Sequence, residues 1–124
     1  MKLILLTFSI FFCNSMCLGE SFKISIYYET LCPDSIRFFR YQFNRTYEDL
    51  LPYMDVDFIP YGHARHTWEN GKWNIQCQHG QKECVGNRFH ACALAQGNGK
   101  EKDVKFISCS MSATNPTSYL KLVE

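Results

Sequence analysis

The sequence lacks an excess of either charge. It holds 13 lysine and arginine residues against 12 aspartate and glutamate residues, and no basic run stands out. Nucleic acid is therefore not an expected partner, because proteins that bind it carry clustered basic charge. Internal repeats and low-complexity segments are also missing, and 124 residues with 46% hydrophobic composition suit one folded domain.

Apolar runs long enough to cross a membrane are missing as well. The apolar run over residues 3–12 is too short to span a bilayer but has the length of a signal-peptide core, and Lys2 supplies the positive charge before it. We interpret residues 1–19 as a secretory signal cleaved after Gly19, with an uncleaved anchor as the alternative. The mature domain, residues 20–124, then has no predicted contact with a membrane.

What the sequence does contain is cysteine. Seven are present, and five remain after Cys13 and Cys17 leave with the signal. In an oxidising compartment four can pair and one is left over, and the sequence does not choose among the three possible connectivities. The candidates for structural disulfides are Cys77, Cys84, Cys92 and Cys109. Asn44 begins an Asn-Arg-Thr acceptor for N-glycosylation, which agrees with secretory passage.

The first half of the mature chain has the pattern of a βαβ unit. Residues 22–28 alternate apolar and polar side chains and predict a strand, and residues 54–60 predict a second one. Between them, an apolar stripe at helical spacing runs from Ile36 to Leu51, with Pro33 at its first turn and Pro52 at its end. A right-handed crossover would make the two strands parallel, so the predicted fold class is α/β.

The second half gives weaker signals. Residues 62–96 show no clear strand, and Asn87 is expected to cap a short helix over residues 88–96 that ends before Gly97. Residues 98–103 read as a polar loop, residues 104–111 as an apolar element of uncertain type, and residues 115–117 as a turn.

Cys32 is the main candidate for chemistry. It opens the string Cys32-Pro33-Asp34-Ser35, a redox-type C-x-x-C in which serine replaces the second cysteine. The predicted βαβ unit puts Cys32 at the carboxyl end of a strand and the N-cap of a helix, where the helix dipole favours a thiolate. The Ser35 hydroxyl is placed to donate a hydrogen bond to that thiolate. The alternative is a buried or paired Cys32 without chemistry.

The segment from Cys77 to Cys84 allows three interpretations. It can form a structural disulfide knot with His79 beside it, or bind substrate directly. It can also supply a zinc site from Cys77, Cys84 and histidines His63, His66 and His79, although the spacing is unusual for zinc and a secretory compartment oxidises thiols. Asp55 and Asp57 are interpreted as a solvated strand edge rather than an acid–base pair.

Taken in order, these segments resemble the gamma-interferon-inducible lysosomal thiol reductase (GILT) family. The resemblance rests on the string from Tyr27 to Ser35, on residues 60–64, on Cys77-Gln78-His79-Gly80 with Glu83, Cys84 and Asn87, and on the residues around Cys92 and Cys109. It covers the chain from Phe22 onward. The resemblance implies a thioredoxin-like fold with a cysteine-rich helical insertion, and reduction of protein disulfides in lysosomes, endosomes or outside the cell.

Two departures from the family shape the functional hypothesis. The family's nucleophile maps onto Cys32, but its resolving cysteine maps onto Ser35, so an external small thiol would have to complete a monothiol cycle. Family members also continue into further strands that this sequence does not supply before Glu124, and an exposed sheet edge would then invite dimerisation. We expect a secreted or lysosomal thiol oxidoreductase acting on disulfide-bonded proteins, with no metal or nucleotide cofactor. The alternative is a catalytically impaired interaction protein on the same scaffold.

Overall fold

A computed structural model describes residues 21–117, and the predicted signal peptide and the chain after residue 117 lie outside this range. The elements follow in the order β1 (Phe22–Tyr28), α1 (Pro33–Phe38), a π-helical segment η1 (Phe39–Phe43), α2 (Asn44–Leu50), a 3-10 turn η2 (Leu51–Tyr53), β2 (Met54–Pro60), β3 (Arg65–Glu69), β4 (Lys72–Gln76), α3 (Gln81–Leu94) and α4 (Lys100–Ser112). The mixture of helices and strands confirms the α/β class. Among the described residues, no helix has the length and apolar character that a membrane crossing requires.

The predicted βαβ unit is present. β1 and β2 pair in parallel, with Phe22 opposite Met54 and Tyr28 opposite Pro60. The connection is one helical run from Pro33 to Leu50, in which the π segment is an interruption of hydrogen-bond pattern rather than a break. Pro33 begins the run because proline fits the first helical position, and Pro52 lies in the 3-10 turn that follows it.

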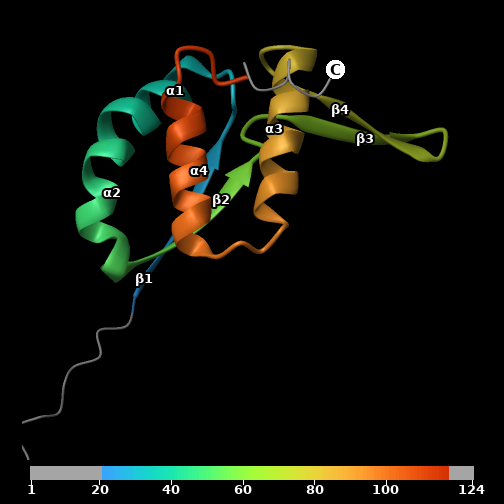
Figure 1. Ribbon diagram of the computed structural model, residues 1–124. Helices are drawn as coiled ribbons and strands as arrows, with labels where there is room; N and C mark the ends of the chain where they lie inside the picture. The colour runs from blue at the N-terminus through green and yellow to red at the C-terminus, as the bar shows by residue number, and fades with distance from the viewer. Residues whose placement is uncertain (1–20, 118–124) are drawn as a thin grey trace, which may run out of the picture.

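Helices cover one face of this strand pair. Figure 1 shows α2, α4 and α3 side by side in front of β1 and β2, with the β3–β4 hairpin projecting away from them. The buried core lies between the helices and the strands, and its aromatic rings meet largely edge to face. It consists of Tyr28, Phe39, Phe43, Tyr47, Phe58, Val104, Ile107 and Met111.

The structure corrects the prediction that residues 62–96 hold no strand. β3 and β4 form an antiparallel hairpin across the two-residue turn Asn70-Gly71, where both residues have positive φ, 50° and 75°. Asn-Gly is the sequence most favoured for such a turn, because both residues accept the left-handed region. The two strands could not be predicted from hydrophobic alternation, because every residue of both is exposed and neither strand has a buried apolar face.

Both later helices begin earlier than predicted. α3 starts at Gln81 rather than Arg88, so Asn87 lies within it and is not its cap. α4 starts at Lys100, inside the segment that was predicted to be a loop, and it includes the apolar residues 104–111. Lys100 pairs with Asp55 of β2, whose carboxyl pKa is lowered chiefly by the hydrogen bond from this lysine, whereas Asp57 is exposed.

Candidate functional site

Cys32 lies in the short connection between β1 and α1, directly before the first residue of the helix. Its backbone N–H donates to the Glu29 carbonyl (3.3 Å), and its own carbonyl accepts from the Ile36 N–H (3.0 Å), which is the first bond of α1. Cys32 is the N-cap residue, as predicted, with extended φ and ψ of −65° and 122°. The thiol is free and partly exposed. Access and a helix amino terminus are two features that reactive cysteines commonly have.

Ser35 is one helical turn away and is held by the backbone. Its Oγ accepts a hydrogen bond from the Glu29 N–H (3.3 Å), which is a different partner from the predicted Cys32 thiolate. A hydroxyl that accepts one bond still has its own proton to donate. Ser35 and Cys32 line one cavity of about 370 Å³ together with Tyr27, Tyr28, Glu29, Asp34, Gly62 and His63.

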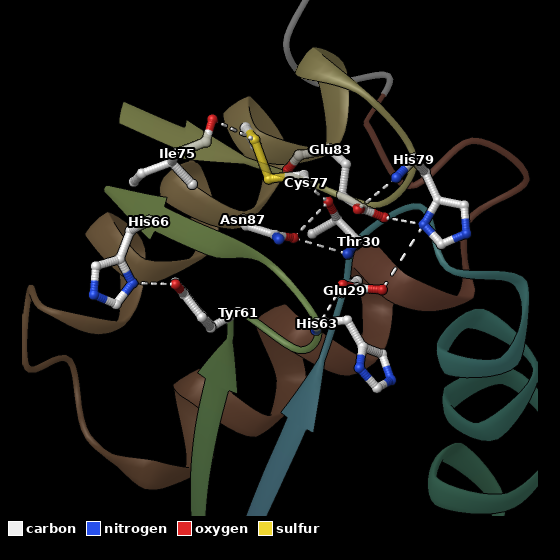
Figure 2. The surroundings of a disulfide bond; sticks show 11 residues. Glu29, Thr30, Tyr61, His63, His66, Ile75, Cys77, His79, Glu83 and Asn87 are labelled. Carbon is white, nitrogen blue, oxygen red and sulfur yellow. Dashed lines mark hydrogen bonds and ion pairs between the residues drawn. A yellow bond between two sulfur atoms is a disulfide. The ribbon is translucent and has the colours of Figure 1, made fainter. Parts of the chain in front are cut away.

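Two buried carboxylates, of which Glu29 lines this cavity, were not among the candidate site residues predicted from the sequence. Glu29 is 2% exposed and Glu83 is fully buried. The Oε1 atom of Glu29 accepts the His63 backbone N–H (2.8 Å), and the Oε1 atom of Glu83 accepts the His79 backbone N–H (3.0 Å). Both Oε2 atoms face the His79 ring, whose Nδ1 lies 2.7 Å from Glu83 and 3.8 Å from Glu29 (Figure 2).

Thr30 joins the end of β1 to α3. Its N–H donates to Asn87 Oδ1 (2.9 Å), and its hydroxyl lies 2.9 Å from the same oxygen and 3.3 Å from the Glu83 carbonyl. The approach is close, since a Cβ added at Gly86 would lie 2.4 Å from Thr30 Oγ1. Only glycine at position 86 lets the helix come this near to the strand.

Tyr28 makes a third connection to α3. Its hydroxyl lies 2.9 Å from His90 Nδ1, and His90 Nε2 lies 2.8 Å from Ser110 Oγ in α4. A neutral imidazole has one acceptor and one donor, which suits this chain of three side chains. Burial lowers the pKa of His90 to about 4, because a charged ring would lose its hydration.

The structure joins Cys77 and Cys84 in a disulfide with a Cα–Cα separation of 5.5 Å (Figure 2). This excludes the zinc interpretation that used both thiols as ligands. His66 lies apart from His79 and pairs with Tyr61. Cys92 and Cys109, the other two candidates for structural disulfides, are free and exposed thiols in the structure, on α3 and α4.

The predicted glycosylation acceptor Asn44 is exposed at the start of α2, and its Oδ1 accepts a hydrogen bond from the buried Ser108 hydroxyl. The acceptor threonine, Thr46, bonds back to the Gln42 carbonyl (3.1 Å).

Comparisons with known proteins match residues 23–122 to the gamma interferon inducible lysosomal thiol reductase (GILT) family. The chain is 32% identical to the gamma-interferon-inducible lysosomal thiol reductase-like protein of Anopheles gambiae, over 77% of this chain and 44% of that protein. It is 40% identical to GILT-like protein 2 of Drosophila melanogaster, over 75% and 44%, and 33% identical to the gamma-interferon-inducible lysosomal thiol reductase of Mus musculus, over 69% and 34%. The chain therefore spans less than half the length of these relatives.

Proposed function

The chain belongs to the GILT family, and on that premise we propose that it is a thiol oxidoreductase that reduces protein disulfides through the single nucleophile Cys32. The observation that carries the proposal is the free, partly exposed Cys32 thiol at the N-cap of a helical run, in a cavity that also holds Ser35. We assign the fold to the thioredoxin-like class, because its βαβ unit positions this cysteine at the end of a strand.

The proposed cycle has three thiol–disulfide exchanges. The Cys32 thiolate attacks one sulfur of the substrate disulfide, and the other substrate sulfur leaves as a thiolate. An external small thiol, such as cysteine or glutathione, then attacks the Cys32 sulfur and releases the second substrate thiolate. A second external thiol frees Cys32 and leaves as a disulfide of the small thiol. Two small thiols are oxidised for each substrate disulfide that is reduced.

Ser35 limits the cycle because a hydroxyl cannot resolve a mixed disulfide. Its proton can stabilise the thiolate of Cys32, because Ser35 Oγ is the acceptor, not the donor, in its hydrogen bond with the Glu29 N–H. If turnover fails, the same features suit the rival function, an interaction protein that uses the scaffold without catalysis.

We also propose a secreted or lysosomal location. It rests on the names of the relatives, on the predicted signal over residues 1–19 and on the exposed acceptor Asn44.

The test measures reduction of a disulfide-linked protein substrate with a small thiol as reductant. Cys32→Ser is expected to abolish the catalysed rate, whereas Cys92→Ser and Cys109→Ser are expected to leave it unchanged, because both thiols lie on other helices. Ser35→Cys is expected to raise the rate when the small thiol is limiting, since it supplies an internal resolving group, and Ser35→Ala serves as its matched control. Turnover that persists in Cys32→Ser would refute the proposal. A full-length protein without turnover and without alkylation of Cys32 would favour the rival.

A further inference from the structure

Glu29, His79 and Glu83 bring three ligand atoms of metal-binding type together. One carboxylate oxygen of each glutamate and a ring nitrogen of His79 all lie within 4.8 Å of one another. The three residues come from the end of β1, the loop before α3 and the first turn of α3. Figure 2 shows the two carboxylates converging on the same side of the imidazole ring.

Each carboxylate is oriented by the backbone so that one oxygen remains for a further partner. The Oε1 atoms are occupied by the His63 and His79 N–H groups. Among the described residues, the buried Oε2 atom of Glu29 has no hydrogen-bond partner, and His79 Nδ1 lies 3.8 Å from it. A buried carboxylate oxygen without a donor is costly, so this atom favours a cation or a hydrogen-bond donor as its partner.

Charge leads to the same conclusion. Glu29 and Glu83 place two carboxylates in the interior, and His79 is the single basic side chain paired with them among the described residues. Buried charges are normally paired or coordinate a metal. A dication between the two Oε2 atoms would balance both carboxylates at once, whereas the histidine can balance only one.

We propose that Glu29 Oε2, Glu83 Oε2 and His79 Nδ1 bind one divalent transition-metal ion of the Zn²⁺ type. One imidazole nitrogen with two carboxylate oxygens is a donor set that zinc accepts, and a site with three protein ligands keeps one position for water. Neighbouring ligands of tetrahedral zinc lie about 3.3 Å apart, for bonds of about 2.0 Å. The distances of 2.7 and 3.8 Å from Nδ1 lie on either side of this value, and one ligand atom from each of the three residues lies within 4.8 Å of the others.

The site differs from the cysteine-based one considered from the sequence. An ion would reach the site from the side of His79, whose side chain is 30% exposed, because both carboxylates are buried. It also does not depend on the proposed reductase activity, because it uses neither Cys32 nor Ser35.

The test titrates Zn²⁺ into the full chain by calorimetry, after free thiols have been blocked with N-ethylmaleimide and with the Cys77–Cys84 disulfide intact. We expect one zinc per chain. His79→Gln and Glu83→Gln should each weaken binding by at least about tenfold, since even the loss of a supporting residue around a metal costs this much. His66→Gln is the matched control, because it removes an exposed imidazole outside the cluster. Co²⁺ in place of Zn²⁺ should give a visible spectrum free of thiolate charge-transfer bands.

His79→Gln is the deciding variant, because its partly exposed side chain can be replaced without unfolding the chain, which near-ultraviolet circular dichroism verifies. The proposal is overturned if the blocked wild-type chain binds no zinc, if His79→Gln binds it as tightly as wild type, or if His66→Gln loses it. In those cases the three residues form a hydrogen-bonded network and nothing more.

Discussion

Acidification is predicted to destabilise the fold through His90. His90 belongs to α3, and its ring is fully buried. As a neutral imidazole it contacts the hydroxyls of Tyr28 in β1 and Ser110 in α4. Its pKa falls from the ordinary 6.5 to about 4 because burial penalises the charged form. In the unfolded chain the same ring is hydrated and takes up a proton near its ordinary pKa.

The sign follows from the two pKa values. The folded-state pKa lies below the unfolded one, so the unfolded chain binds more protons, and stability is lost as pH falls from about 6.5 toward 4. At about 1.4 kcal/mol for each unit, the loss between pH 7 and pH 5 comes to roughly 2 kcal/mol. A protein working in an acidic compartment would therefore lose a sizeable part of an ordinary domain's stability, which is about 5–15 kcal/mol.

Urea unfolding at pH 7 and pH 5 measures this loss. Wild type is expected to lose about 2 kcal/mol more than His90→Gln over this interval. His90→Gln starts from a lower stability at pH 7, because it gives up part of the contact with Tyr28 and Ser110. His66→Gln is the control, because it makes the same substitution at an exposed ring outside the contact of His90 with Tyr28 and Ser110. If wild type and His90→Gln lose the same free energy, the acid sensitivity lies in other groups and the reasoning is refuted.

Two further predictions concern packing and the disulfide. Gly86→Ala would stabilise an open helix by about 1 kcal/mol, but here the new Cβ would lie 2.4 Å from Thr30 Oγ1. We therefore expect Gly86→Ala to destabilise the fold by about 1–3 kcal/mol in thermal unfolding. The loss should be smaller when Thr30 is also replaced by alanine. A Gly86→Ala variant that is more stable than wild type would contradict the close contact. Replacing Cys77 and Cys84 together by alanine opens a loop with a sequence separation of 7. We expect it to cost about 2–3 kcal/mol in urea unfolding, and a wild type whose midpoint is unchanged by a reducing agent would argue against a stabilising disulfide.

The βαβ unit could be predicted because its signals are local. Alternation of apolar and polar residues in 22–28 and 54–60 predicts the two strands, each of which contributes one buried residue, Tyr28 and Phe58. The prolines at 33 and 52 mark the start and end of the helical run. Cys32 could be placed at the N-cap for the same reason. These features follow from backbone geometry and from one apolar face, both of which a single sequence displays.

α3 could not be predicted in full because its buried face is polar. The buried residues are Glu83, Gly86, Asn87 and His90, at helical spacing, whereas Cys92 is exposed. A search for apolar periodicity passes over such a helix. The hairpin was difficult to predict for the opposite reason, because its apolar side chains are exposed rather than buried. Trp68, Trp73 and Ile75 are among them. In the hairpin, the Asn70-Gly71 turn was the signal that could have revealed the strands.

The polar face of α3 explains how a segment more than forty residues away in the sequence fixes the position of Cys32. Three consecutive residues at the end of β1 each meet this helix or the loop before it: Tyr28 bonds His90, Glu29 faces His79 beside Glu83, and Thr30 bonds Asn87. Apolar contacts tolerate a shifted register, but buried donors and acceptors do not, because each shift leaves several of them unpaired. The disulfide closes the loop directly before α3, so it helps to set where that helix begins. The segment from Cys77 to Cys84 and the rest of α3 therefore hold residues 28–30 in place, and these residues end two positions before Cys32.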